Sequence, residues 1–386
     1  MIPYGKQDLN ASDIKSVLKV LSSDFLTQGP QVPLFEKTIS DYCSSEFGIA
    51  VNSATSALHI ACLALGLQSG DIFWTSTISF VASANCGLYC NAKVDFVDID
   101  PLTYNLCTLE LEKKLIRAKK ENKLPKIVIP VHIAGQSCNM RKLYSLSQEY
   151  GFKIIEDASH AIGGKYFNKP IGSCQYSDIT VLSFHPVKVI TTGEGGMALT
   201  NNEKLASSMR RLRSHGITRE KTDMQQMPKN EIWNYQQVEL GFNYRMTEIA
   251  AALGISQMRR LDDFVCRRHI LRKRYDQLLS GLPMTLPHQS SDCYSALHLY
   301  PIQIDLQKVN KSHHQIYEEL LENGIGVNLH YIPVHRHPYY QKMGFKVGDF
   351  PIAENYFNRA LTLPLFFRMT FEQQDKVVRV LRKVLI

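Results

Sequence analysis

Apolar and polar positions follow two periods along this chain, and the switches between them predict its elements. Short apolar runs predict strands at residues 47–51, 72–75, 93–97, 126–131 and 153–156. Helical spacing predicts helices at residues 11–23, 31–45, 55–65, 80–89, 108–122 and 140–150. Asn10 can cap the first of these helices, and Gly66 is placed to end the third. Strands that alternate with helices predict a largely parallel sheet with helices on both faces.

The second half of the chain changes its pattern, which predicts a second domain. Two further strands are expected at 178–182 and 197–200. A long helical stretch at 246–276 looks like a bridge from the large domain to a smaller one. Beyond the bridge we expect two strands, at 298–304 and 325–329, and two helices, at 311–323 and 371–384. The prediction is an α/β protein. A large domain with a mixed, mostly parallel sheet and N-terminal helices would span residues 1–255, and a smaller α+β domain residues 256–386.

Length and charge narrow the class of protein. The 386 residues are 44% hydrophobic, which is enough for a large core and about two domains. The formal net charge is +8, but the basic residues are spread along the chain and form no run interleaved with aromatic residues. We therefore expect no nucleic acid partner, and the chain has no zinc-ligand spacing that would predict a metal site. A basic surface of this kind favours small phosphorylated ligands.

Cysteine use and hydropathy indicate a cytoplasmic protein. The nine cysteines are an odd number without C-x-x-C spacing, so we expect reduced core residues rather than disulfides. The first residues lack the charged and apolar segments of a signal peptide. No apolar run approaches the roughly 20 residues that span a bilayer, so no membrane partner is expected.

Lys188 and Asp157 carry the strongest chemical signal. Lys188 lies in an apolar stretch followed by the cluster Gly193–Gly196, and Asp157 ends an apolar run upstream. A buried lysine that can hold the cofactor covalently, and an acid that keeps its ring nitrogen protonated, are the minimum for pyridoxal phosphate (PLP) chemistry. We therefore predict PLP as the cofactor and Lys188 as the catalytic residue. The glycines are expected to supply positive φ angles, and the alternative role of Asp157 is that of a helix cap.

Other residues near predicted strand ends are candidates for cofactor binding. Ala54 and Thr55 follow the first strand and open a helix, whose free N–H groups can bind the cofactor phosphate. Ser183 can add a hydroxyl to the same phosphate. Phe80 can stack on the pyridine ring, or it can be ordinary core. His160 can contact the phenolic oxygen of the cofactor, or it can be a structural histidine.

Eight motifs occur together along the chain, at residues 26–30, 52–58, 78–82, 156–161, 183–196, 213–216, 241–246 and 327–333. In this order they resemble the sugar aminotransferases of the DegT/DnrJ/EryC1/StrS family, a branch of the fold-type I PLP-dependent transferases. The resemblance covers nearly the whole chain. It implies an aspartate aminotransferase-like fold and an enzyme that transfers an amino group to a nucleotide-linked keto sugar.

Ala54 and His160 stand where most members of this family have glycine and glutamine. In this the chain is similar to the branch that acts in pseudaminic acid biosynthesis. That resemblance implies L-glutamate as donor and the 4-keto carbon of a UDP-4-keto-6-deoxy-N-acetylhexosamine, UDP-2-acetamido-2,6-dideoxy-β-L-arabino-hex-4-ulose, as acceptor. Asn243 matches an asparagine that reaches the cofactor phosphate from the neighbouring subunit, which implies a homodimer with shared active sites.

Other activities stay open at this point. The resemblance also fits amination of another nucleotide-linked keto sugar, or of an aminocyclitol ketone. One branch of the family removes a sugar hydroxyl and has histidine at the position of Lys188, which disfavours dehydration here. A regulator of this fold that does not catalyse a reaction would not need both Lys188 and Asp157.

Overall fold

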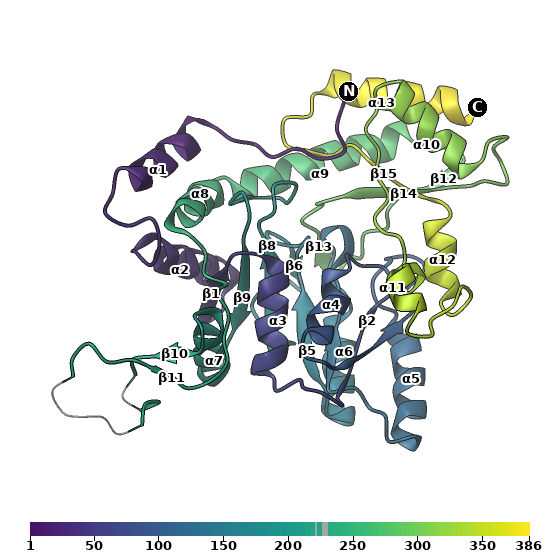
Figure 1. The fold of residues 1–386 in the computed structure, drawn as a ribbon. Coiled ribbons are helices and arrows are strands. Elements are labelled where there is room, and N and C mark those ends of the chain that lie inside the picture. Colours follow the sequence, from purple (N-terminus) through teal and green to yellow (C-terminus); the bar gives the residue numbers. More distant parts are fainter. Residues whose placement is uncertain (221, 226–230) are drawn as a thin grey trace.

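The computed structural model describes residues 1–220, 222–225 and 231–386. Its centre is a seven-stranded sheet in the order β1-β9-β8-β5-β4-β2-β3 (Figure 1). The strands span Phe47–Val51 (β1), Ile72–Ser76 (β2), Lys93–Val97 (β3), Ile127–Ile129 (β4), Lys153–Asp157 (β5), Ile179–Ser183 (β8) and Gly196–Thr200 (β9). Strands β8, β5, β4, β2 and β3 are parallel, whereas β9 runs antiparallel to both of its neighbours. The predicted α/β fold with a mixed, mostly parallel sheet is confirmed.

Helices cover both faces of this sheet because successive strand residues point to opposite sides. On one face Phe73, Ile127 and Ile155 pack in a core with residues of three helices, α3 (Ala54–Ala64), α4 (Ala82–Leu88) and α7 (Glu203–Arg213). Their chain neighbours Trp74 and Val128 pack on the other face with α5 (Thr108–Lys120) and α6 (Met140–Tyr150). The central strands are therefore apolar on both sides, which is why they read as continuous apolar runs.

The helix ends follow the chemistry of their sequence. Asn10 caps α1 (Ala11–Leu21) by accepting hydrogen bonds from two backbone N–H groups, and Asp13 completes a capping box. Helix α2 spans Gln31–Cys43. Helix α3 ends just before Gly66, whose φ of 75° lies in the left-handed region that favours glycine.

The C-terminal part of the chain builds a second core around a smaller sheet. The predicted helical bridge is two helices, α8 (Glu248–Met258) and α9 (Leu261–Leu278). They lead to the antiparallel strands β12 (Met284–Thr285), β14 (Tyr300–Ile304) and β15 (Ala360–Leu363) and to the helices α10 (His313–Glu322), α11 (Pro338–Gln341), α12 (Pro351–Phe357) and α13 (Phe371–Leu385). Both termini lie at this end of the molecule (Figure 1).

Residues 325–329 do not form the predicted strand. Ile325 and Asn328 make only isolated bridges, to Ile2 and Thr362. Ile325 and Val327 of this segment are buried in the C-terminal core, so their burial does not require a continuous ladder. Ile2 belongs to the same core, which joins the start of the chain to its end.

Two small sheets complete the fold. Strands β6 (Lys165–Tyr166), β7 (Lys169–Pro170) and β13 (Cys293–Tyr294) pair beside the large sheet. Strands β10 (Ile217–Thr218) and β11 (Gln236–Gln237) form an arm that projects from the body near α7 (Figure 1).

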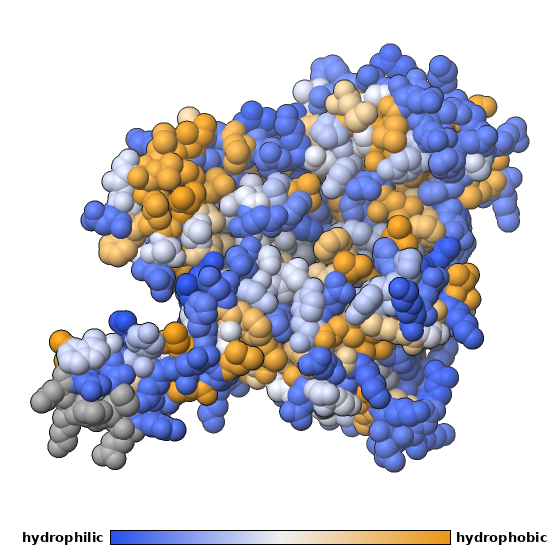
Figure 2. Space-filling model, in the orientation of Figure 1, coloured by the Kyte–Doolittle hydropathy of each residue, from blue (hydrophilic) through white to orange (hydrophobic). Residues whose placement is uncertain are grey.

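An apolar patch lies on the surface of α1 and the segment that follows it. Its members are all about half exposed or more: Ile14, Leu18, Leu21, Phe25, Leu26 and Leu34. Figure 2 shows apolar side chains gathered over this corner of the molecule. No helix within the described ranges is both long and apolar enough to cross a bilayer.

Candidate active site

A cavity of about 600 Å³ lies at the carboxyl ends of the parallel strands. Parallel α/β sheets bind ligands at this edge. Side chains that follow four of the strands line it, among them Ser53 after β1, Ser79 after β2, Asp157 at the end of β5 and Ser183 at the end of β8. Seven of the eight predicted site residues contribute to its wall: Ala54, Thr55, Phe80, Asp157, His160, Ser183 and Lys188.

Asp157 is held by hydroxyl and backbone donors at the base of the cavity. One carboxylate oxygen accepts a 2.6 Å hydrogen bond from the Ser83 hydroxyl. The other accepts from the Ser159 hydroxyl at 2.5 Å and from the Ser159 N–H at 3.1 Å. The carboxylate is only 5% exposed, so these bonds fix its position. The predicted alternative role, that of a helix cap, does not apply, because residues 159–163 form turns and not a helix.

Lys188 projects from the loop between β8 and β9. Its backbone N–H donates to the His185 carbonyl in a turn. Of the three glycines predicted to have positive φ angles, only Gly193 does, at 85°, whereas Gly195 and Gly196 do not. Burial lowers the pKa of Lys188 to about 8, and the nearby charge of Asp157 opposes that shift. The amine can therefore release and accept a proton near neutral pH.

The start of α3 forms a cradle for an anion. Ser53 caps the helix and accepts from the Ser56 N–H at 3.1 Å. The N–H groups of Ala54 and Thr55 lie in the first turn, where a helix offers them no acceptor. Gly196 of β9 lies directly against this turn. A Cβ there would be 2.5 Å from the Ala54 nitrogen and from Ser53 backbone atoms. The sequence thus requires glycine where β9 and the cradle meet.

Four aromatic residues complete the cavity wall, and the sequence did not single them out: Tyr4, His298, His330 and Tyr331. Burial, together with the charge of Lys188, lowers the pKa of His298 and of His330, for His330 to about 3. These rings are therefore neutral. His330 and Tyr331 lie in the motif at residues 327–333 that carried the family resemblance, but no local pattern indicates that any of the four faces Lys188.

His160 shares this neutral environment. It is 5% exposed, and burial lowers its pKa well below the ordinary value, with Lys188 and His330 adding to the shift. Its Nε2 lies 3.0 Å from the Tyr331 hydroxyl. Its Nδ1 is buried and has no hydrogen-bond partner among the described residues. A buried ring nitrogen without a partner is costly unless a ligand supplies one.

Phe80 and Asn243 occupy more open positions. Phe80 lies two residues before α4 and is 59% exposed, so a face of its ring is available to a ligand in the cavity. Asn243 forms an isolated bridge with Ser214, is exposed, and does not line the cavity of its own chain. Its predicted contact with a cofactor therefore requires a second copy.

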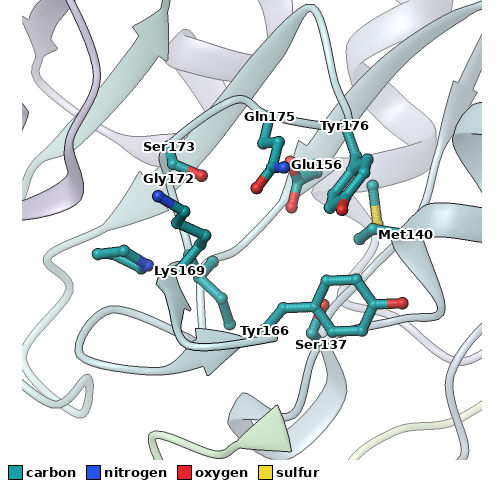
Figure 3. A pocket seen from close by; sticks show the side chains of 11 residues that line it. Ser137, Met140, Glu156, Tyr166, Lys169, Gly172, Ser173, Gln175 and Tyr176 are labelled. Carbon is teal, nitrogen blue, oxygen red and sulfur yellow. The ribbon is translucent and has the colours of Figure 1, made fainter. Parts of the chain in front are cut away.

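One of the other pockets is much smaller and lies on the opposite face of β5 (Figure 3). Its volume is about 20 Å³, the size of a water molecule, and Glu156, Tyr166 and Lys169 are among the residues that line it. The Glu156 carboxylate accepts from His132 Nε2 at 2.7 Å and from the Ser177 hydroxyl at 2.5 Å. This pocket is too small for a sugar nucleotide, and its Glu156 carboxylate already has hydrogen-bond donors within the protein.

The residues around the large cavity fit the predicted cofactor. The cradle at α3 suits a phosphate, Asp157 suits a protonated ring nitrogen, and the partnerless Nδ1 of His160 suits an oxygen acceptor. Lys188 lines the same cavity with a lowered pKa, which favours the neutral amine that covalent attachment needs.

Comparison with known proteins agrees with this geometry. The sequence pattern of the DegT/DnrJ/EryC1/StrS aminotransferase family matches residues 7–382. A UDP-4-amino-4,6-dideoxy-N-acetyl-beta-L-altrosamine transaminase of Campylobacter jejuni is 34% identical over 100% of this chain and 98% of its own. Helicobacter pylori PseC, an aminotransferase of pseudaminic acid biosynthesis, superposes with a TM-score of 0.90 at 30% identity, covering 100% and 99% of the two chains. Spr1654 of Streptococcus pneumoniae, solved in PMP- and PLP-forms, superposes with a TM-score of 0.90 at 27% identity in its PMP-form, covering 100% and 99%.

Proposed function

Because the chain belongs to the DegT/DnrJ/EryC1/StrS aminotransferase family, we propose that it transfers the amino group of L-glutamate to the 4-keto carbon of a UDP-4-keto-6-deoxy-N-acetylhexosamine. The protein is a PLP-dependent sugar aminotransferase. The finer proposal takes as acceptor UDP-2-acetamido-2,6-dideoxy-β-L-arabino-hex-4-ulose, the keto sugar of pseudaminic acid biosynthesis. Its main support is the Campylobacter jejuni transaminase, whose name specifies that type of sugar and which matches this chain from end to end.

The observation that carries the proposal is the meeting of Lys188, Asp157 and the α3 cradle around one cavity. Bound PLP supplies an electron sink and carries the amino group between the two substrates. Lys188 would hold the cofactor covalently and would move protons to and from the reacting carbon, for which a pKa of about 8 is well placed. Asp157 would face the ring nitrogen as an anion, held in place by Ser83 and Ser159.

The other cavity residues have binding roles in this proposal. The N–H groups of Ala54 and Thr55 and the hydroxyls of Thr55 and Ser183 would hold the phosphate. Phe80 would stack on the pyridine ring, and His160 would donate a hydrogen bond to the phenolic oxygen. The neutral histidines and Tyr331 leave this wall without a fixed charge, which suits an uncharged sugar ring rather than its diphosphate.

A substrate panel tests the acceptor. The purified holoenzyme is incubated with L-glutamate and, separately, with UDP- and dTDP-linked 4-keto and 3-keto sugars, and the products are measured by mass spectrometry together with 2-oxoglutarate. We expect one amino group gained per 2-oxoglutarate formed, fastest with the UDP-linked L-arabino 4-keto sugar. Faster turnover of a dTDP-linked or 3-keto sugar would replace the proposed acceptor but leave the aminotransferase assignment intact.

We also propose a homodimer whose two copies share active sites. Asn243 is exposed and does not line its own cavity, and the apolar patch on α1 offers a surface for a second copy (Figure 2). Asn243→Ala and Lys188→Ala subunits are each expected to be impaired. Mixed and re-annealed, they should regain part of the activity, because one of the two sites in a heterodimer has both residues. Heterodimers without regained activity, measured at limiting PLP, would remove Asn243 from the shared site.

The predicted cytoplasmic location stays a prediction.

A further inference from the structure

The Tyr331 side chain joins the C-terminal part of the chain to His160. Its hydroxyl lies 3.0 Å from His160 Nε2, and the two rings are nearly parallel, with centroids 6.0 Å apart at an interplanar angle of 25°. Both side chains line the cavity. We propose that Tyr331 is a positioning residue that fixes which nitrogen of His160 carries the proton and so presents His160 Nδ1–H to the phenolic oxygen of PLP. This inference rests on the proposed contact between His160 and that oxygen.

The direction of the hydrogen bond follows from what the phenol can do. Burial raises the pKa of Tyr331, and the charge of Asp157 raises it further, so the phenol keeps its proton. Among the described residues, His160 Nε2 is the one hydrogen-bond partner of the hydroxyl. The phenol proton has no other acceptor among the described residues, so in the proposed arrangement Tyr331 donates and Nε2 accepts. A neutral imidazole has one N–H, so the proton of the ring is then on Nδ1.

His132, on the other face of the sheet, shows the same device with the opposite result. Its Nδ1 accepts the Cys138 backbone N–H at 3.1 Å, which can only donate. The ring proton is consequently on Nε2, which donates to Glu156. In each case one fixed donor decides the tautomer. At His132 the Nε2–H group donates to the Glu156 carboxylate. At His160 the Nδ1–H group has no acceptor among the described residues.

The surroundings of His160 keep its ring neutral, so the tautomer alone decides whether Nδ1 can donate a hydrogen bond. The titratable groups that face it are Lys188, His298, His330 and Tyr331, and none is an acid that would charge the ring. The His298 ring lies 4.5 Å away, centroid to centroid, and is itself neutral. A neutral ring can donate from Nδ1 only if Nε2 is kept as the acceptor, and Tyr331 supplies that condition.

A hydrogen bond to the phenolic oxygen affects how firmly the bound cofactor holds its proton. The donor draws negative charge from the oxygen, and this charge otherwise helps to retain the proton at the nitrogen that joins the cofactor to the protein. Loss of the donor should therefore raise the pH at which the bound cofactor changes its absorbance. The midpoint of this change reports on the bond without any turnover.

The experiment is a pH titration of the holoenzyme followed by visible absorbance. His160→Leu should raise the midpoint by about one pH unit, and Tyr331→Phe should raise it in the same direction by about half as much. In a His160→Gln background the amide N–H₂ can donate without the phenol, so adding Tyr331→Phe should change nothing. Tyr356→Phe is the matched control. It removes a phenol that donates to the His330 carbonyl at 2.8 Å, one residue away, and should leave the midpoint unchanged.

A second measurement reads the tautomer itself in the cofactor-free protein. In ¹⁵N-histidine NMR spectra the His160 ring is the signal missing from His160→Gln. We expect an Nδ1–H ring in the wild type and a loss of that preference in Tyr331→Phe. An Nε2–H ring in the wild type, or a shifted midpoint in His160→Leu with none in Tyr331→Phe, would overturn the role of Tyr331 alone. An unshifted midpoint in His160→Leu would overturn the His160 contact as well, but not the aminotransferase activity.

Discussion

Glu156 and Asp157 are adjacent in the chain but face opposite sides of β5. Their exposed fractions are 6% and 5%, so burial does not separate them. Glu156 is enclosed by donors from His132, Ser177 and Thr180 beside a pocket of about 20 Å³. Asp157 lies beside a cavity of about 600 Å³.

The histidines near the two carboxylates differ in their hydrogen bonding. On the Glu156 side both ring nitrogens of His132 have partners. On the Asp157 side Nδ1 of His160 and Nδ1 of His298 have none among the described residues. A structural polar site satisfies itself, whereas a binding site keeps groups in reserve for its ligand. The comparison predicts that changes to either carboxylate cost stability, whereas only changes on the Asp157 side cost activity.

The largest effect is expected from Lys188→Ala. Without the amine there is no covalent attachment and no proton carrier, so turnover should fall by about 10⁴-fold or more, with little change in the free energy of unfolding. Turnover and urea unfolding of the cofactor-free protein measure the two effects. Lys169→Ala is the control, because that lysine lines the small pocket across the sheet (Figure 3). Near-normal turnover in Lys188→Ala would remove Lys188 from catalysis.

The sharpest contrast is between Asp157→Asn and Glu156→Gln, since each exchanges one carboxylate for an amide of the same shape. Asp157→Asn should slow the half-reaction with glutamate by about 10²-fold. It should also lower the free energy of unfolding, because the Ser83 and Ser159 donors lose their charged acceptor. Glu156→Gln should keep the rate but lower the free energy of unfolding by about 1–3 kcal/mol, since His132, Ser177 and Thr180 lose a charged acceptor.

The pH dependence of the Glu156 effect has a defined sign. Burial raises the pKa of Glu156, but the hydrogen bonds from His132, Ser177 and Thr180 outweigh it and leave the pKa below its ordinary value. The stability that this carboxylate contributes is therefore present above the pKa of the unfolded chain and lost as the pH falls through the folded value. Equal losses of activity in Asp157→Asn and Glu156→Gln would erase the distinction between the two sides.

Gly196→Ala should have a smaller effect that is confined to the cavity side. The added Cβ would press on the Ala54 nitrogen and Ser53 from 2.5 Å and open the phosphate cradle. Overpacking of this size costs about 1–3 kcal/mol, so PLP affinity should fall by about tenfold or more. Titration of the cofactor-free protein with PLP measures it. Gly5→Ala is the control, because an added Cβ there meets nothing within 4 Å. Unchanged affinity in Gly196→Ala would mean that the cradle does not hold the phosphate.

The smallest effect concerns the pH at which Lys188 becomes reactive. Attachment of PLP to the cofactor-free protein requires the neutral amine, so its rate should rise with pH to a midpoint near 8, well below the ordinary lysine pKa of about 10.4. The charge of Asp157 stabilises the ammonium form, so Asp157→Asn should move the midpoint lower. Stopped-flow absorbance measures both. A midpoint that rises in Asp157→Asn would contradict the electrostatic link between the two residues.

The sequence predicts the large sheet well because its strands are buried on both faces. The patterns of β1 and α6 predict their bounds to the residue, and the runs at β2 and β5 predict theirs within one residue. Periodicity carries no strand direction, so it could not show that β9 runs antiparallel. Nor could it show that the helical bridge breaks at Arg259–Arg260, or that β15 exists, since its four residues carry too little pattern.

The candidate site divides in the same way. Lys188, Asp157 and the α3 turn are marked by local sequence, since each follows a strand whose end is predictable. Local sequence does not mark Tyr331 and His298, because they come from the C-terminal part of the chain and only tertiary packing brings them to the cavity. Their chemistry depends on neighbours far away in the sequence, and no local pattern records it.

The position of β9 in the sheet has a consequence for how the chain is made. Within the sheet, β1 pairs with β9 and with no other described strand. While a ribosome synthesises the residues from 52 to 195, β1 has no strand to pair with, although β2, β3, β4 and β5 can already join one another. The nascent chain therefore carries an unpaired, apolar strand through much of its synthesis, which is the stage at which chaperones and proteases compete for it. β9 is the last strand of the large sheet to emerge, and its pairing closes both the sheet and the cradle at α3 in one event.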